Sequence, residues 1–147
     1  KTLIRNRENT VFLMAGGKGS RLLPLTKKTP KPLLKIKGVP IIEKIILSFK
    51  SQGFKNFTIS VNYLGHKIKK YLGNGERLKV NINYINEKKY LGTAGSLSLI
   101  DFKKTAFPLI VANSDLLSEI DYNNLLDYHV KKNADITICG KNKFFEI

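Results

Sequence analysis

Residues 11–21 read VFLMAGGKGSR, a short apolar run that leads directly into a glycine-rich loop. The continuous apolar run from Val11 to Ala15 is typical of a parallel strand that is buried on both faces. The glycines that follow let backbone N–H groups approach a ligand closely, and Arg21 can bind phosphate oxygens with two hydrogen bonds at once. This stretch therefore predicts a buried strand that ends in a phosphate-binding loop.

Two familiar phosphate-loop patterns do not fit this loop. A P-loop has a glycine five residues before its Gly-Lys pair, and no glycine precedes Gly17 at that distance. The dinucleotide-binding pattern fails because Leu22 stands where the third glycine would be. Taken alone, the loop from Ala15 to Arg21 is also compatible with a tight turn that binds nothing.

Strand-like and helix-like segments alternate along the rest of the chain. Apolar residues at helical spacing predict helices over 40–52, 66–72, 95–100 and 121–132. Apolar runs and alternating patterns predict strands over 57–61, 80–85, 107–112 and 135–139. Asp121 is the expected N-cap of the last helix. Alternating strands and helices predict an α/β fold with a doubly wound, mostly parallel sheet.

Length and composition fit one domain with a substantial core, since the chain has 147 residues of which 42% are hydrophobic. Residues 1–10 are expected to be a linker or the edge of a cloned fragment, and residues 11–147 the folded part. No apolar run approaches the roughly 20 residues of a transmembrane helix, so no membrane partner is expected. The single cysteine, Cys139, lies in an apolar run and is expected to be buried, which suits a reducing cytoplasm.

The net charge of +15 is the largest anomaly of composition. A basic protein attracts nucleic acid, anionic lipid or phosphorylated small molecules. The lysines are spread along the chain as pairs that flank apolar segments, which indicates a solvated surface. The aromatic residues do not form the stacking motif of RNA-binding modules. No specific nucleic-acid partner is therefore expected, although a basic nucleic-acid-binding module stays as a weaker alternative.

Two further motifs favour the phosphate interpretation. Lys31 stands between Pro30 and Pro32, which fix the backbone on both sides and hold the ammonium in a defined place. Asp115 follows the strand at 107–112, and the carboxyl ends of parallel strands share the edge where ligands bind. A carboxylate oxygen is a ligand that Mg²⁺ prefers in phosphate sites. The alternatives are a rigid surface turn at Lys31 and a helix cap at Asp115.

Together these stretches resemble the signature of the sugar nucleotidyltransferase family, and in particular mannose-1-phosphate guanylyltransferase-like proteins. The resemblance runs from about Val11 to the end of the chain, and its motifs are GGKGSRLLPLT (16–26), PKPLL (30–34), LGTAGSL (91–97) and ANSD (112–115). Ser114 stands where many members have glycine. The resemblance implies that residues 11–147 are the N-terminal nucleotide-binding part of a nucleotidyltransferase domain. Its fold would be Rossmann-like, and its C-terminal part, with the sugar pocket, would be missing here.

The resemblance also implies roles for particular residues. Arg21 would hold the outer phosphates, Lys31 would contact the phosphate under attack, and Asp115 would bind Mg²⁺, which makes these three the catalytic set. The implied nucleotide site consists of Ala15, Gly16, Gly17, Gly19, Ser20, Arg21, Asn62, Glu87, Gly92 and Thr93. A carboxylate at Glu87 can accept two hydrogen bonds from guanine, which favours GTP, although a solvated glutamate fits nearly as well. Asn62 is equally plausible as a turn residue.

The reaction that the resemblance implies is attack by the phosphate of a sugar 1-phosphate on an NTP, which releases pyrophosphate and gives an NDP-sugar. The substrates would be the NTP and the sugar 1-phosphate, Mg²⁺ the cofactor and the cytoplasm the location. A homo-oligomer and a regulatory domain upstream are compatible with the family. Residues 1–147 are expected to be inactive alone. A non-catalytic relative that binds a nucleotide sugar is the alternative, and the retained charged residues argue against it.

Overall fold

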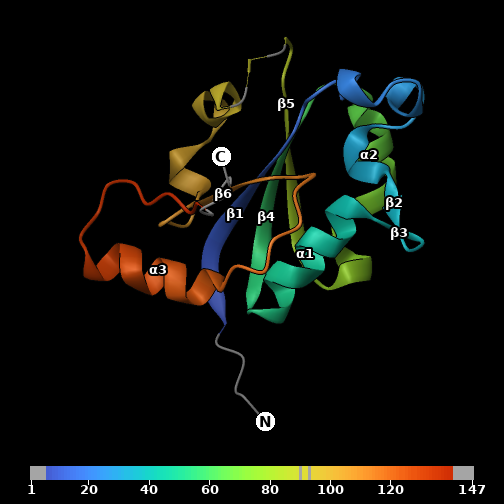
Figure 1. Cartoon of the computed structure of the whole chain (residues 1–147). Coiled ribbons are helices and arrows are strands. Elements are labelled where there is room, and N and C mark those ends of the chain that lie inside the picture. Colours follow the sequence, from blue (N-terminus) through green and yellow to red (C-terminus); the bar gives the residue numbers. More distant parts are fainter. Residues whose placement is uncertain (1–5, 90, 93, 141–147) are drawn as a thin grey trace, which may run out of the picture.

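A parallel four-stranded sheet forms the centre of the computed structural model, which describes residues 6–89, 91–92 and 94–140 (Figure 1). Its strands are β1 (Arg7–Ala15), β4 (Phe54–Val61), β5 (Asn81–Asn86) and β6 (Ile110–Asn113), in the order β5-β4-β1-β6. Every neighbouring pair is parallel. The predicted α/β fold with a parallel sheet is therefore confirmed. Two short strands, β2 (Lys35–Ile36) and β3 (Val39–Pro40), form a separate antiparallel pair.

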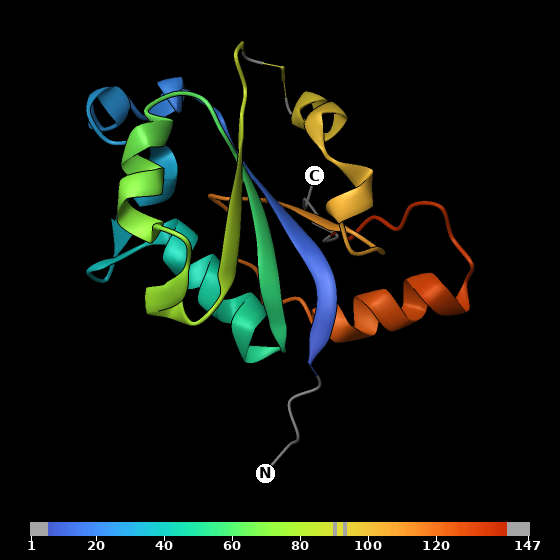
Figure 2. The same ribbon diagram turned by 180° about the vertical axis from the view of Figure 1, so that it is seen from behind.

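Helices cover the sheet from two sides. The α-helices of the described residues are α1 (Ile41–Ser51), α2 (Gly65–Leu72) and α3 (Tyr122–Lys131). Short 3-10 helices lie at η1 (Ser20–Leu22), η2 (Leu25–Lys27), η3 (Lys31–Leu33), η4 (Glu76–Leu78), η5 (Gly95–Leu99) and η6 (Phe102–Lys104). Figures 1 and 2 show α1 and α2 on one side of the sheet and η5 and η6 on the other. None of the helices in the described part of the chain is long and apolar enough to cross a membrane.

The core lies between the sheet and α1. Ile42, Ile46 and Phe49 recur at helical spacing on α1 and are completely buried, which is why this segment forms a helix on the sheet. The ring of Phe49 stacks on Tyr122, with 3.9 Å between the ring centroids. This contact packs the first turn of α3 against α1. Asp121 caps α3 as predicted, because its side chain accepts a hydrogen bond from the Asn124 N–H.

The strand order places a ligand-binding crevice between β1 and β6. From β1 the chain adds β4 and then β5 on one side, and afterwards it crosses to add β6 on the other side. In open parallel sheets, ligands bind outside the carboxyl ends of the strands at the point where the direction of strand addition reverses. Ala15 ends β1 and Asn113 ends β6. The glycine-rich loop and Asp115 follow these two ends directly.

Some predicted elements differ from the structure. The strand predicted over 135–139 is wrong, because the described residues of this segment form no strand and Ile136 and Ile138 are 80% and 87% exposed. Cys139 is exposed for the same reason, so its predicted burial is also wrong. Alternating apolar residues are compatible with a strand only where a neighbouring strand is present to pair with them. The segment from Gly95 forms a 3-10 helix instead of a longer helix, and β1 begins earlier than predicted, at Arg7.

An ionic contact between a buried carboxylate and a half-exposed arginine joins α1, α2 and η4. The Glu43 carboxylate accepts hydrogen bonds from the Tyr71 hydroxyl and from the guanidinium of Arg77, whose nearest nitrogen is 2.6 Å away. Glu43 is only 9% exposed, and Arg77 also lies over the Tyr71 ring. The hydrogen bonds with Arg77 lower the pKa of Glu43 although burial opposes this, and burial together with Glu43 raises the pKa of Tyr71.

Replacing Glu43 with glutamine is expected to lower the free energy of unfolding by about 1 kcal/mol at neutral pH, because the charge that strengthens its hydrogen bonds to Tyr71 and to the half-exposed Arg77 is removed. The folded-state pKa of Glu43 lies below its ordinary value of 4.5. The contribution of the ionised Glu43 to the free energy of unfolding is therefore complete above pH 4.5. It is lost as the pH falls through the folded-state pKa of Glu43. Thermal unfolding over a pH series measures this difference. Glu119→Gln, at an exposed position, is the control, and a difference that persists unchanged into acid would contradict the assignment.

Candidate active site

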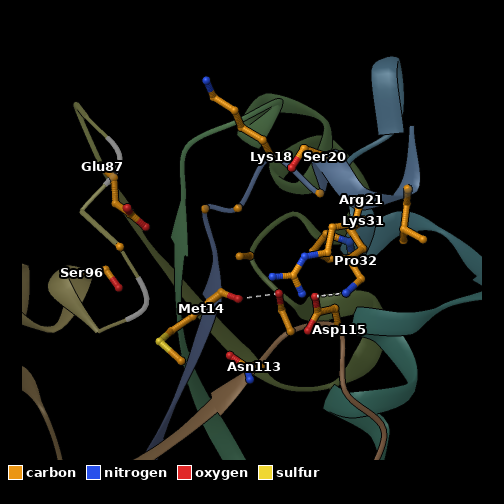
Figure 3. Close-up of a pocket in the computed structure, with 17 residues that line it drawn as sticks. Met14, Lys18, Ser20, Arg21, Lys31, Pro32, Glu87, Ser96, Asn113 and Asp115 are labelled. Carbon is orange, nitrogen blue, oxygen red and sulfur yellow. Dashed lines mark hydrogen bonds and ion pairs between the residues drawn. The ribbon is translucent and has the colours of Figure 1, made fainter. Parts of the chain in front are cut away.

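A pocket of about 590 Å³ opens at the carboxyl ends of β1 and β6 (Figure 3). It lies where the strand order predicts a ligand site. The described residues that line it are Met14, Ala15, Gly16, Gly17, Lys18, Gly19, Ser20, Arg21, Leu22, Lys31, Pro32, Glu87, Gly92, Ser96, Asn113, Ser114 and Asp115. The pocket thus collects side chains from segments that are far apart in the sequence.

The glycine-rich loop forms one wall of the pocket and turns sharply at Gly19. Gly19 has a φ of 63°, in the left-handed region that favours glycine. A Cβ at this position would lie 3.0 Å from Thr26 Cγ2 and 3.3 Å from Lys31 Cβ. The hydroxyl of Thr26, a completely buried residue, donates a hydrogen bond to the Gly19 carbonyl oxygen at 2.8 Å. The turn brings Arg21, on η1, to the pocket.

Lys31 is held in place by its two proline neighbours. Pro30 and Pro32 are both buried, and the Leu33 N–H closes a turn on the Pro30 carbonyl oxygen at 2.8 Å. The Lys31 ammonium reaches the Asp115 carboxylate at 2.7 Å. Both side chains keep about a third of their surface exposed, at 36% and 31%. The two groups expected from the sequence to contact phosphate and metal therefore form an ion pair with each other.

Asp115 is positioned by the serine that precedes it. The Ser114 hydroxyl donates a hydrogen bond to the Met14 carbonyl oxygen at 2.6 Å, and the Ser114 N–H lies 3.2 Å from the same oxygen. These bonds join the end of β6 to the end of β1. Ser114 is 2% exposed, whereas the next residue turns its carboxylate into the pocket (Figure 3). A side-chain hydroxyl at position 114 thus helps to fix the chain immediately before the carboxylate.

The donor set suits Mg²⁺ that is bound together with phosphate. No group of three or more His, Cys, Asp or Glu side chains that could hold a metal occurs in 6–89, 91–92 and 94–140. Mg²⁺ commonly takes one or two carboxylates from the protein and completes its coordination with phosphate oxygens and water. Asp115 is one such carboxylate at a pocket that also presents Arg21 and Lys31. The residues present therefore fit a magnesium ion that is shared with a bound phosphate.

Glu87 lies on the side of the pocket opposite Lys31 and Asp115 (Figure 3) and is 7% exposed. Its neighbours Lys88 and Lys89 are exposed, so Glu87 differs from them and is not a solvated side chain. The carboxylate lies directly against Gly16, where an added Cβ would overlap one of its oxygens. Its other oxygen is 3.5 Å from the Leu91 N–H. A buried carboxylate in a ligand pocket is suited to accept hydrogen bonds from a ligand.

The structure places most of the predicted site residues at one pocket, but not all of them. The glycine-rich loop, Lys31, Glu87, Gly92 and Asp115 line it together. Asn62 does not line it, and its side chain donates a hydrogen bond to the Glu87 carbonyl oxygen at 2.7 Å. Thr93 lies outside the residues that the structure describes.

Several lining residues were missed by sequence reasoning, namely Met14, Lys18, Leu22, Pro32, Ser96, Asn113 and Ser114. All but Met14 belong to the motifs that carried the resemblance, so membership in a motif was an available signal. Met14 is the residue before the last of β1. Nothing in its apolar side chain indicates that it faces a pocket.

The pocket has two chemically different ends. Figure 3 shows Glu87 and Ser96 on one side and Arg21, Lys31 and Asp115 on the other. The cationic end can bind a polyphosphate through charge-assisted hydrogen bonds. The buried carboxylate at the other end offers acceptors for a group that carries N–H donors. An elongated ligand with a phosphate chain at one end and a hydrogen-bonding ring at the other fits this arrangement.

A comparison with known protein families gives one match over almost the whole chain. The model of the nucleotidyl transferase family matches residues 10–143. The matched region contains the glycine-rich loop, Lys31, Glu87 and Asp115. The residues that build the pocket are therefore included in the family match.

Curated relatives show similarity at about one-third identity. Mannose-1-phosphate guanylyltransferase of Mycobacterium tuberculosis is 32% identical over 126 residues, which are 86% of this chain and 35% of that protein. N-acetylmuramate alpha-1-phosphate uridylyltransferase of Neisseria meningitidis is 38% identical over 112 residues, which are 76% of this chain and 48% of that protein. The chain thus spans between about a third and a half of the length of these relatives.

A solved structure is similar over the same region. HddC from Yersinia pseudotuberculosis, in complex with GMP-PN, matches with a TM-score of 0.74 and 26% identity. The match covers 83% of this chain and 54% of that structure. The fold of this chain is therefore similar to that of a solved structure.

Proposed function

The chain belongs to the nucleotidyl transferase family, and from this premise we propose that it forms the nucleotide-binding part of a sugar-1-phosphate nucleotidyltransferase. The full-length protein would transfer a nucleotidyl group from an NTP to a sugar 1-phosphate. Pyrophosphate and an NDP-sugar would be the products. The observation that carries the proposal is the presence of Arg21, Lys31 and Asp115 beside the glycine-rich loop in one pocket.

The chemistry of this pocket agrees with such a reaction because no general base is needed. The phosphate of a sugar 1-phosphate is already an anion at neutral pH, so the protein must bring two anions together and align them. Arg21 and Lys31 would neutralise charge on the reacting phosphates, and the N–H groups of the glycine-rich loop would donate hydrogen bonds to them. These groups would therefore act by holding the phosphates in place and by neutralising their charge.

Asp115 is the residue that we propose as the protein ligand of Mg²⁺. When bound, the ion would supply positive charge at the phosphates that react. The carboxylate is paired with Lys31 in the structure. Lys31 and Asp115 therefore lie next to each other at the place where a phosphate and its metal ion would be held.

The proposed activity is tested by measuring pyrophosphate release from the full-length protein. Five NTPs are combined with several sugar 1-phosphates, and each pair is assayed with and without Mg²⁺. Release that requires both substrates and the ion supports the proposal. A protein that binds NTPs and releases no pyrophosphate with any sugar 1-phosphate would be a binding protein and not a transferase.

We propose GTP as the nucleotide. The two adjacent donors on the Watson–Crick edge of guanine match the two oxygens of the Glu87 carboxylate. Burial of this side chain supports the proposal, since a buried carboxylate that accepts both bonds discriminates strongly against a base that lacks the donors. The bound guanine nucleotide of the Yersinia structure is consistent with it.

Glu87→Gln is expected to reduce the preference for GTP over ITP by about tenfold, which corresponds to the loss of one hydrogen bond of 1.4 kcal/mol. ITP lacks the amino group of guanine, so the comparison isolates the second hydrogen bond. Equilibrium binding of both nucleotides to the full-length protein gives the ratio. Glu76→Gln, at an exposed position, is the control. An unaltered ratio in Glu87→Gln would remove this residue from base recognition.

A further inference from the structure

The corner between β4 and α2 is hydrogen-bonded to Glu87, at one end of the pocket, and to the segment that follows the glycine-rich loop. Figures 1 and 2 show α2 beside the short 3-10 helices that follow the glycine-rich loop. The corner begins with Asn62 and Tyr63, directly after the last residue of β4. Neither residue belongs to the described lining of the pocket. Both side chains instead hydrogen-bond to backbone carbonyl groups, that of Glu87 in the pocket and those of Thr26 and Lys27 beside it.

Asn62 fixes the segment that carries Glu87. The regular pairing of β4 with β5 ends at Val61 and Asn86. One residue further, the Glu87 N–H donates to the Val61 carbonyl oxygen at 3.0 Å, and Asn62 Nδ2 donates to the Glu87 carbonyl oxygen at 2.7 Å. The backbone of Glu87 is therefore held on both sides. This anchoring directs its carboxylate onto Gly16.

Tyr63 fixes the segment that follows the glycine-rich loop. Its hydroxyl lies 3.2 Å from the Thr26 carbonyl oxygen and 3.0 Å from the Lys27 carbonyl oxygen. Thr26 in turn donates its side-chain hydrogen bond to Gly19, the sharp turn of the phosphate loop. Through Thr26, the tyrosine hydroxyl therefore supports the position of the phosphate loop without touching the pocket.

We propose that Asn62 and Tyr63 are positioning residues of the nucleotide site. Asn62 sets the position of the base-recognition segment, and Tyr63 sets the position of the phosphate loop. Because the two residues are adjacent in the chain, the corner fixes the spacing between the two ends of the pocket. A site held at the correct spacing binds an elongated ligand without first having to order its own loops. The inference rests on the proposed nucleotide-binding function.

Two probes separate the two roles in equilibrium binding to the full-length protein. GTP contacts both ends of the pocket, whereas inorganic tripolyphosphate has no base and reports on the phosphate loop alone. Asn62→Ala is expected to weaken GTP binding by about three- to tenfold, the effect of one hydrogen bond, and to leave tripolyphosphate binding unchanged. Tyr63→Phe is expected to weaken the binding of both probes by a similar factor.

Matched controls distinguish positioning from a general loss of structure. Asn56, near the other end of β4, also donates from Nδ2 to a backbone carbonyl oxygen, that of Glu8 at 3.1 Å. Tyr84 likewise donates its hydroxyl to the Gly73 carbonyl oxygen at 2.7 Å. Asn56→Ala and Tyr84→Phe are expected to leave the affinities for both probes unchanged. Asn62→Leu keeps nearly the same side-chain shape and removes the donor without adding charge, so it should behave as Asn62→Ala does.

The outcomes are distinct. A wild-type protein that binds GTP, together with Asn62 variants that bind it equally well, would overturn the inference and leave the proposed function intact. Equal losses in the matched controls would also overturn it. A wild-type protein that binds neither GTP nor tripolyphosphate would overturn the proposed function itself. Melting temperatures of all variants show whether each one is folded.

Discussion

Replacing Lys31 with alanine is expected to lower kcat of the full-length protein by about 10²- to 10³-fold, the effect of removing one charged group from a transition state of phosphoryl transfer. Lys31 is the cation whose backbone is fixed by two buried prolines, so its charge has a defined position at the pocket. Its ion pair with Asp115 is partly exposed, and such pairs contribute about 1 kcal/mol or less to stability. Turnover should therefore fall far more than stability.

Steady-state kinetics and thermal unfolding of the same preparations measure these two quantities. Lys31→Met keeps most of the side-chain volume near Gly19 and removes only the charge, so it should lose as much turnover as Lys31→Ala. Lys35→Ala, an exposed lysine on β2, is the control and should change neither quantity. If Lys31→Ala lost turnover only in proportion to the fraction of unfolded protein, Lys31 would be part of a rigid turn and not a catalytic residue.

Asp115→Asn is expected to remove most of the Mg²⁺-dependent gain in NTP binding and to lower turnover by about 10²- to 10³-fold. Asparagine has nearly the same size, but a neutral amide oxygen is a much weaker ligand for Mg²⁺ than a carboxylate. The Ser114 hydrogen bonds to β1 do not involve the Asp115 side chain, so the end of β6 should keep its position.

Titration of NTP at several Mg²⁺ concentrations tests this prediction, and electron paramagnetic resonance of bound Mn²⁺ gives a readout that does not depend on turnover. Asp135→Asn changes the same charge at an exposed position and serves as the control. Unchanged metal dependence in Asp115→Asn would mean that another group holds the ion.

Most of the fold could be predicted from the sequence because buried residues recur with the spacing of a strand or of a helix. Val11 to Ala15 read as a buried strand, and Ile42, Ile46 and Phe49 recur as one face of a helix. The exception at 135–139 has a physical cause. An alternating pattern identifies the residues that burial would favour, but a strand also needs hydrogen-bonding partners, and the described part of the segment has no paired neighbour.

The motifs of the candidate site could be predicted from the sequence, but the contacts between them could not. The glycine-rich loop, Lys31 and Asp115 each carried a local signal of composition or spacing. Their juxtaposition depends on the fold, since Lys31 and Asp115 follow different strands and meet only when β1 and β6 are neighbours. The role of Asn62 was ambiguous in the sequence because a terminal amide bonds equally well to a ligand or to a backbone carbonyl group.

The close approach of Gly16 and Glu87 links the evolution of two distant positions. A side chain at position 16 would meet the end of the Glu87 side chain, so the carboxylate keeps its present place only with glycine at 16. A change of base preference through a shorter residue at 87 would free that space and release the constraint. A side chain at position 16 is therefore expected to alter base recognition for as long as position 87 is a glutamate.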